Sequence, residues 1–221
     1  MNKIKWLYCL VFSIILVSCA GKGYLASYNF SLSEVHQNSK IDTAVNRDYF
    51  KNYNYEDSII NIYWDPSPHE FAFTLTNKTN SSIQIIWDKC VIVDEDGQSH
   101  RIMHRGVKII DRNESQPITV VAPQGKVSDF VVPTDHAYFT TYPIKGEYMG
   151  WNQAPILPVR DKRKAKISFK KPEEVSESHF YNEVKSKEGK AIRVILPIHS
   201  NNQLLEYDFE FTIDDAKVIV R

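Results

Sequence analysis

An all-β sandwich is the fold class that the sequence predicts, and three observations support it. From Ile59 onward, apolar residues recur at every second position, which is the period of a strand with one buried face. Turn signals rich in Gly, Pro and Asn separate these runs at the spacing typical of sandwiches. A parallel α/β fold would need a helix between successive strands, and the sequence holds no recurrent helical pattern of sufficient length.

Three turn signals separate the strands expected in the first half of this region. The polar segment 77–80 ends the first clear alternation, and Asp96-Gly97 is a dipeptide that favours a tight hairpin. Pro123-Gln124-Gly125 marks the third turn. The strands expected around these turns cover residues 71–76, 83–87, 90–93, 119–122 and 127–132.

The second half begins with a long irregular loop at residues 143–158. The charged segment 172–190 is expected to hold one short helix, and residues 205–213 give the cleanest apolar–polar alternation of the chain. The strands expected here cover residues 167–169, 193–198, 205–213 and 217–221. Eight or nine short strands with at most one short helix predict a single immunoglobulin-like β-sandwich domain over residues 47–221.

The N-terminus has the features of an export signal. Lys3 and Lys5 precede residues 6–17, which are apolar except for Ser13 and too short to cross about 30 Å of hydrocarbon as a helix. The sequence Leu16-Val17-Ser18-Cys19 that follows resembles the lipobox of bacterial prolipoproteins. An ordinary secretory signal would favour a small-x-small ending instead. The resemblance implies removal of the signal peptide 1–18 and lipidation of Cys19, whose acyl chains, at about 0.8 kcal/mol per buried CH₂, would make membrane attachment stable.

The polar segment 19–46 is interpreted as a lipidated tether, with one strand expected near residues 24–30. The tripeptide Ala20-Gly21-Lys22 after the cysteine lacks the aspartate that retains enteric lipoproteins in the inner membrane. It also lacks the acidic run that accompanies surface export in Bacteroidetes. By these analogies, we expect the folded body to face the periplasm from the outer membrane.

Charge and cysteine content argue against a nucleic-acid-binding protein and against a domain stabilised by disulfides. Lys+Arg and Asp+Glu both number 27, and loss of the signal removes two lysines and no acid, which leaves the mature chain slightly acidic. General nucleic-acid binding needs a clear basic excess and is therefore not expected. Cys9 leaves with the signal and Cys19 would carry lipid, so Cys90 has no partner for an internal disulfide, and the core alone must hold the domain together.

The residues that could act in catalysis or metal binding lack the spacing and surroundings that such sites need, which favours a non-enzymatic protein. His100 and His104 have the spacing of a metal pair only on a helix; on a strand they would lie about 13 Å apart, too far to share an ion. The other histidines show no ligand spacing. Cys90 lies among apolar residues and is interpreted as a buried hydrophobe rather than a nucleophile. We therefore expect no metal, no cofactor and no catalytic residues.

Two surface segments are candidates for partner binding. The first is the loop that carries the aromatic residues between positions 138 and 151, because large rings on loops are favoured at interfaces. Its rings could instead fold back over an open end of the sandwich. The basic run 160–171 is the other, with a charged, solvated strand edge as its alternative interpretation. The aromatic residues proposed for partner binding are Tyr138, Phe139, Tyr142, Tyr148 and Trp151.

Part of the body also resembles small immunoglobulin-like lipoproteins of unknown function. The resemblance lies in Asn77-Lys78-Thr79 at a strand end, in residues 83–88 ending in Trp87-Asp88, and in Ala122-Pro123 at a later strand start. It implies the fold and supplies no active site. The resulting hypothesis is a membrane-anchored envelope lipoprotein that binds or assembles with a protein or glycan. The alternatives are a cell-envelope enzyme acting on peptidoglycan or glycan with a site scattered in sequence, and a lipoprotein that braces the envelope.

Overall fold

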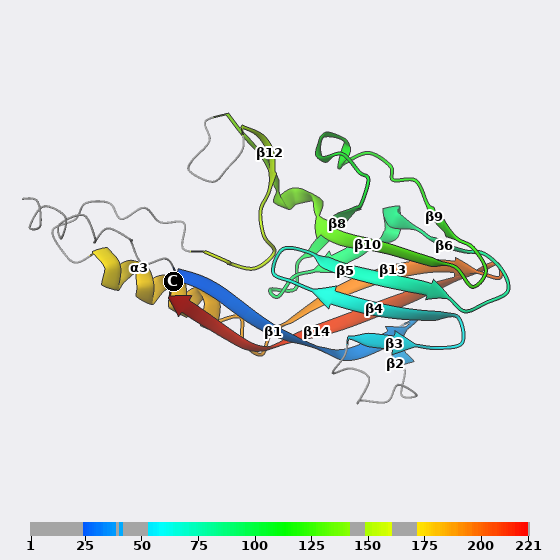
Figure 1. Cartoon of the computed structure of the whole chain (residues 1–221), viewed down its shortest axis with the longest axis horizontal. Helices are drawn as coiled ribbons and strands as arrows, with labels where there is room; N and C mark the ends of the chain where they lie inside the picture. Colours follow the sequence, from blue (N-terminus) through cyan, green and yellow to red (C-terminus); the bar gives the residue numbers. More distant parts are fainter. Residues whose placement is uncertain (1–23, 39, 42–52, 142–148, 161–171, 221) are drawn as a thin grey trace, which may run out of the picture.

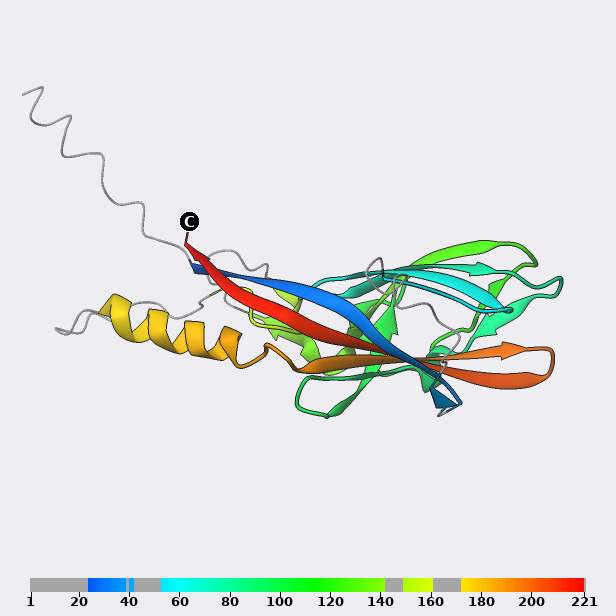
Figure 2. The same ribbon diagram turned by 90° about the horizontal axis from the view of Figure 1, so that it is seen from below.

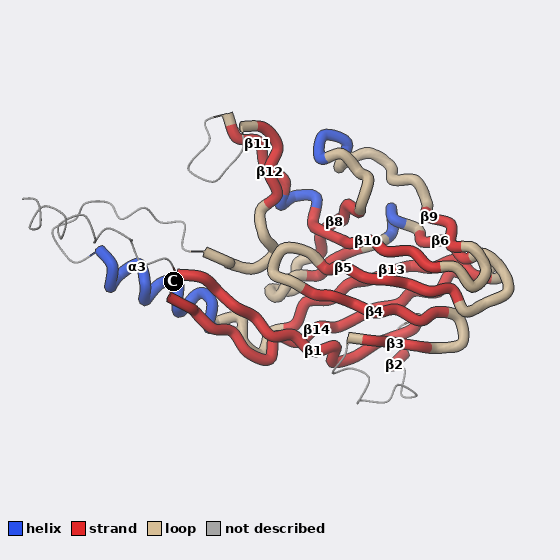
Figure 3. The backbone as a smooth tube through the Cα atoms, viewed as in Figure 1, coloured by secondary structure: helices blue, strands red, loops and turns tan. Residues whose placement is uncertain are grey.

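The computed structural model describes residues 24–38, 40–41, 53–141, 149–160 and 172–220. These residues form an antiparallel β-sandwich with one α-helix, which confirms the all-β prediction (Figures 1 and 3). The expected number of eight or nine strands is wrong, because the described residues contain fourteen. Most of the additional strands have two to four residues, too few for a two-residue period to be recognised.

Two sheets make up the sandwich, and β8 (Ser99–His104) joins them by pairing with β7 on one side and β10 on the other. The sheet order is β2-β1-β14-β13-β7-β8-β10-β5-β4-β3, with β6 and β9 attached through β13. The first sheet contains β1 (Tyr24–Gln37), β2 (Lys40–Ile41), β6 (Ile83–Ile85), β7 (Val91–Val93), β9 (Thr119–Val121), β13 (Ala191–Ser200) and β14 (Gln203–Val220). The second contains β3 (Asn54–Glu56), β4 (Ile60–Pro66), β5 (Phe71–Asn77) and β10 (Lys126–Pro133).

The core lies between the two sheets and is rich in aromatic rings. Trp64 of β4 packs on Phe209 and Phe211 of β14, with ring centroids 5.1 and 5.4 Å apart. Phe73 of β5 lies beside Trp64 at 5.0 Å. The predicted alternation holds in β5 and in residues 205–213, since the large apolar residues of both segments are buried.

Strand β1 corrects the expected tether. Strand β1 lies alongside β14, the blue and red ribbons of Figure 2. The two strands pair from Tyr24 opposite Val220 to Gln37 opposite Tyr207. Strand β1 therefore belongs to the folded body, and the expected strand near residues 24–30 is the first half of a longer one. Register shifts after Asn29 and after Leu32 interrupt the two-residue period, so the buried side chains do not alternate regularly in the sequence.

Asn77 explains why the Asn-Lys-Thr sequence sits at the end of β5. Its side chain is fully buried, and its amide nitrogen donates to the carbonyl oxygens of Ser81, Val121 and Ala122 at 2.7, 3.1 and 3.0 Å. Its carbonyl oxygen accepts from the backbone N–H and the hydroxyl of Thr79. One side chain thus fixes the turn after β5 and ties it to β9.

The helix α3 (Pro172–Lys185) lies within the segment where a helix was expected. Phe180 and Val184 on it are buried in the main hydrophobic core. In the described part of the chain, no helix has both the length and the apolar character needed to cross a membrane.

Candidate functional site

An aromatic hairpin stands apart from the two sheets of the sandwich. Strands β11 (Ala137–Thr140) and β12 (Gly150–Gln153) pair only with each other in the described structure, in a separate two-stranded sheet that projects from the body (Figures 1 and 3). Phe139 lies opposite Trp151 in its register. We use the name aromatic hairpin for these two strands together with Met149.

The rings of the hairpin contact one another at the surface. Phe139 and Trp151 meet edge to face with centroids 5.4 Å apart, and the Arg112 guanidinium lies 4.3 Å from the centre of the Trp151 ring. Arg112 directly follows the short helix η2 (Ile109–Asp111). Phe139 is 56% exposed and Met149 is 76% exposed, so the apolar surface of the hairpin is open to contact.

Three of the five aromatic residues proposed for partner binding lie in this hairpin, Tyr138, Phe139 and Trp151, and the rings of Phe139 and Trp151 contact each other. The other two, Tyr142 and Tyr148, lie outside the described residues, as do Cys19 and the basic run beyond Arg160. Trp151 is half-buried and is absent from the hydrophobic core, which places its ring against Phe139 and Arg112 rather than over the interior of the sandwich.

The base of the aromatic hairpin is anchored to the body by polar contacts. The short helix η3 (Thr134–His136) leads directly into β11. The backbone N–H of Ala154 donates to the His136 carbonyl at 2.8 Å, and the Gln153 side chain donates to the Pro133 carbonyl at 3.3 Å. These contacts close the hairpin where it leaves the sandwich.

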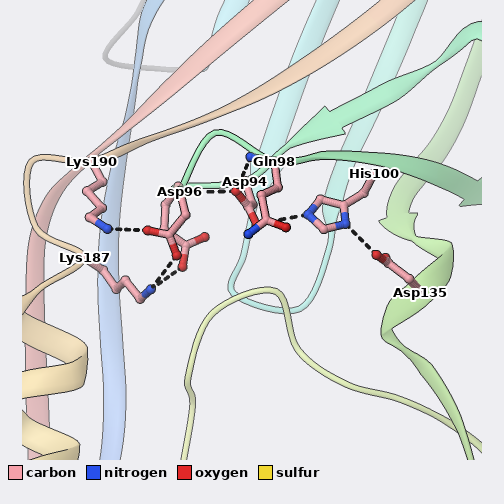
Figure 4. A network of polar contacts seen from close by, with 8 residues as sticks. Asp94, Asp96, Gln98, His100, Asp135, Lys187 and Lys190 are labelled. Carbon is pink, nitrogen blue, oxygen red and sulfur yellow. Dashed lines mark hydrogen bonds and ion pairs between the residues drawn. The ribbon is translucent and has the colours of Figure 1, made fainter.

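Beside this base, His100 of β8 lies between two carboxylates. Its Nδ1 is 2.7 Å from Asp135 Oδ2 and its Nε2 is 3.0 Å from Asp94 Oδ2 (Figure 4). Burial of the ring opposes protonation, but the carboxylates of Asp94 and Asp135 raise the pKa of His100 above its ordinary value. For Asp94, burial acts to raise the pKa, while His100 and two backbone N–H groups lower it below its ordinary value.

His136 lies beside His100 and Asp135 and forms a polar group with them. Its ring centroid is 5.7 Å from that of His100, and the two ring planes meet at 70°. The sequence did not predict the group, because Asp135 is 35 positions from His100 in the chain and only the fold brings them together. The signal available in the sequence was the pair Asp135-His136 beside an expected strand, which is too common to interpret alone.

The turn between β7 and β8 that holds Asp94 is also tied to the segment after α3. Lys190 Nζ lies 2.6 Å from Asp96 Oδ1 (Figure 4), and Lys187 pairs with Glu95. The predicted hairpin turn at Asp96-Gly97 is confirmed, with Gly97 at a φ of +82°. The turn thus links the segment after α3, β8 and η3 through charged side chains.

His104, the other histidine considered for a metal pair, has different surroundings. Its ring stacks on Trp87 at 3.9 Å, and its Nδ1 lies 3.1 Å from Asp129 Oδ2. It lines a pocket of about 320 Å³ next to the base of the hairpin, together with Met103, Phe130 and Gln153. His100 and His104 therefore share no partner.

Cys90 occupies the buried position expected for it. It is 2% exposed, and its thiol donates to the Ile86 carbonyl at 3.5 Å. Burial raises the pKa of the thiol far above its ordinary value. A thiol held protonated and out of contact with solvent is a poor nucleophile.

Comparison with known proteins adds no assignment: no family model matches the chain, and no similar curated protein or solved structure was found.

Proposed function

We propose that this chain is a lipid-anchored binding protein of the bacterial cell envelope, and that its aromatic hairpin contacts a protein partner. The observation that carries the proposal is the projecting pair Phe139 and Trp151, with Arg112 stacked on the tryptophan. Aromatic residues, Met and Arg are the types enriched at protein interfaces, and Trp and Arg recur among the residues that dominate binding energy.

The chemistry of the hairpin favours a protein over a glycan. A sugar stacks on an open ring face, and the Arg112 guanidinium already covers one face of Trp151. Phe139 and Met149 instead offer apolar surface that a complementary apolar patch would bury. We favour binding over catalysis in the envelope because the thiol of Cys90 is buried and hydrogen-bonded to a backbone carbonyl.

Attachment to the outer membrane, with the body facing the periplasm, rests on the sequence. Leu16-Val17-Ser18-Cys19 supplies the lipobox, and Cys19→Ala should abolish labelling by an alkynyl fatty acid and release the protein into the soluble exported fraction. Equal labelling of both forms would exclude the anchor. Digestion of the body by protease added to intact cells would exclude the periplasmic orientation.

Site-specific photo-crosslinking tests the binding surface. A photoreactive phenylalanine analogue at Phe139 is expected to yield one discrete crosslinked protein in living cells. The matched control carries the same analogue at Tyr63, which is 49% exposed on β4 in the sandwich. Loss of the crosslink on adding Met149→Lys would support the hairpin as the contact surface. Equal crosslinking from both positions, or none from Phe139, would exclude it.

A further inference from the structure

Three side chains at the base of the aromatic hairpin present metal-ligand atoms to one another. One donor atom each from His100, Asp135 and His136 lies within 4.8 Å of the other two. They come from β8 and η3, which the sandwich places side by side. Two imidazoles and one carboxylate form the donor set of open zinc sites with three protein ligands.

His136 contributes a second, independent observation. Its Nδ1 is buried and makes no hydrogen bond. Buried polar atoms almost always have a partner, and an imidazole nitrogen that no protein group pairs can accept a metal ion.

The surroundings of His100 are those of a metal ligand. Nδ1 faces Asp135, while Nε2 lies 3.0 Å from Asp94 Oδ2 on the other side of the ring. Asp94 Oδ1 in turn accepts from the backbone N–H groups of Asp96 and Gln98 at 2.9 and 2.8 Å (Figure 4). A carboxylate that accepts the second N–H of a ligating histidine fixes both the tautomer and the direction of the ring.

We propose that His100, Asp135 and His136 bind a divalent transition metal ion, with Zn²⁺ as the favoured ion. Imidazole ligands select such ions over Mg²⁺ and Ca²⁺, which prefer oxygen ligands alone. A metal ion binds His100 Nδ1 only when this nitrogen carries no proton, so any proton held between it and Asp135 passes to solvent when the ion binds. The Asp135 side chain is exposed, so water can reach the ion from this side of the site.

The bound ion would link β8 directly to η3 and hence to the first strand of the aromatic hairpin. Ligand–metal distances near 2 Å would draw the three donors together by small shifts at the hairpin base. The site does not depend on the identity of the partner that the hairpin contacts. The crosslinking and the metal measurements therefore fail or succeed separately.

Calorimetric titration with Zn²⁺ alone tests the proposal, on tag-free full-length protein in a non-chelating detergent buffer. The wild type is expected to bind one equivalent and to melt at a higher temperature when zinc is present. His100→Ala, His136→Ala and Asp135→Asn should each weaken binding at least tenfold. Asp94→Asn, which alters only the outer hydrogen bond, should weaken it about tenfold or more.

The matched control is His179→Ala, since His179 is exposed on α3 away from the cluster and should leave zinc affinity unchanged. Asp135→Asn keeps an exposed side chain of the same shape, so it reports on metal binding even if a histidine variant folds poorly. Absence of zinc binding by the wild type, or equal binding by wild type and Asp135→Asn, would overturn the proposal.

Discussion

The substitution Trp151→Ala tests whether Trp151 belongs to a binding surface or to the hydrophobic core. In the structure, Trp151 makes one edge-to-face ring contact and one contact with a guanidinium. An aromatic pair contributes about 0.5–1.5 kcal/mol and an exposed cation–π contact about 0.5–1 kcal/mol. We therefore expect Trp151→Ala to lower the free energy of unfolding by about 1–2.5 kcal/mol.

The comparison variant is Trp64→Ala, in which a fully buried ring between the two sheets is removed. Deleting such a ring costs about 3–5 kcal/mol. Urea unfolding followed by far-UV circular dichroism measures both losses without relying on tryptophan fluorescence. A loss for Trp151→Ala as large as that for Trp64→Ala would show that the hairpin is part of the core. Retention of the crosslink from position 139 in Trp151→Ala would contradict a binding role for this ring.

Three further predictions follow from buried polar and titratable groups. Asn77→Ala should cost about 1.5–4.5 kcal/mol, since it removes three hydrogen bonds from a buried amide to carbonyl oxygens, each worth about 0.5–1.5 kcal/mol, and a loss under about 1 kcal/mol in urea unfolding would contradict this role. Cys90 should fail to react with a thiol reagent at pH 8 until the protein is unfolded, because burial raises the pKa of its thiol. Fast labelling of the folded protein would show instead that the thiol is accessible. Burial raises the pKa of Asp208, although Arg193 opposes this, so the folded state loses stability as pH rises from the unfolded to the folded pKa of this carboxyl. Asp208→Asn should therefore melt higher than the wild type at pH 7 with no gain near pH 3, and an equal shift at both pH values would exclude this titration as the cause.

The elements that the sequence predicts well are those whose two-residue period is unbroken. Strand β5 and the segment 205–213 alternate without interruption, and both have one face in the core. The sequence predicts a tether over most of β1 because this segment is polar, and two register shifts break its alternation while its partner lies at the opposite end of the chain. Pairing between such distant segments leaves no local pattern to recognise.

The two candidate sites also differ in how far the sequence alone predicts them. Phe139 and Trp151 were predicted because aromatic residues in a Gly-containing segment are visible in a single stretch of sequence. The group of His100, Asp135 and His136 was not, because it depends on how η3 settles beside β8. Neither residue spacing nor composition carries that information.

The pairing of β1 with β14 also sets how far the body can stand from a bilayer. If lipids are attached at Cys19, only residues 20–23 separate them from Tyr24, the first of the described residues and one that pairs with β14. Four residues span at most about 14 Å when fully extended. The folded body would then be held close to the membrane, with the end where Tyr24 pairs with Val220 near the lipid headgroups. A partner embedded in the same membrane would be within reach, whereas one on the far side of the periplasm would have to come to the protein.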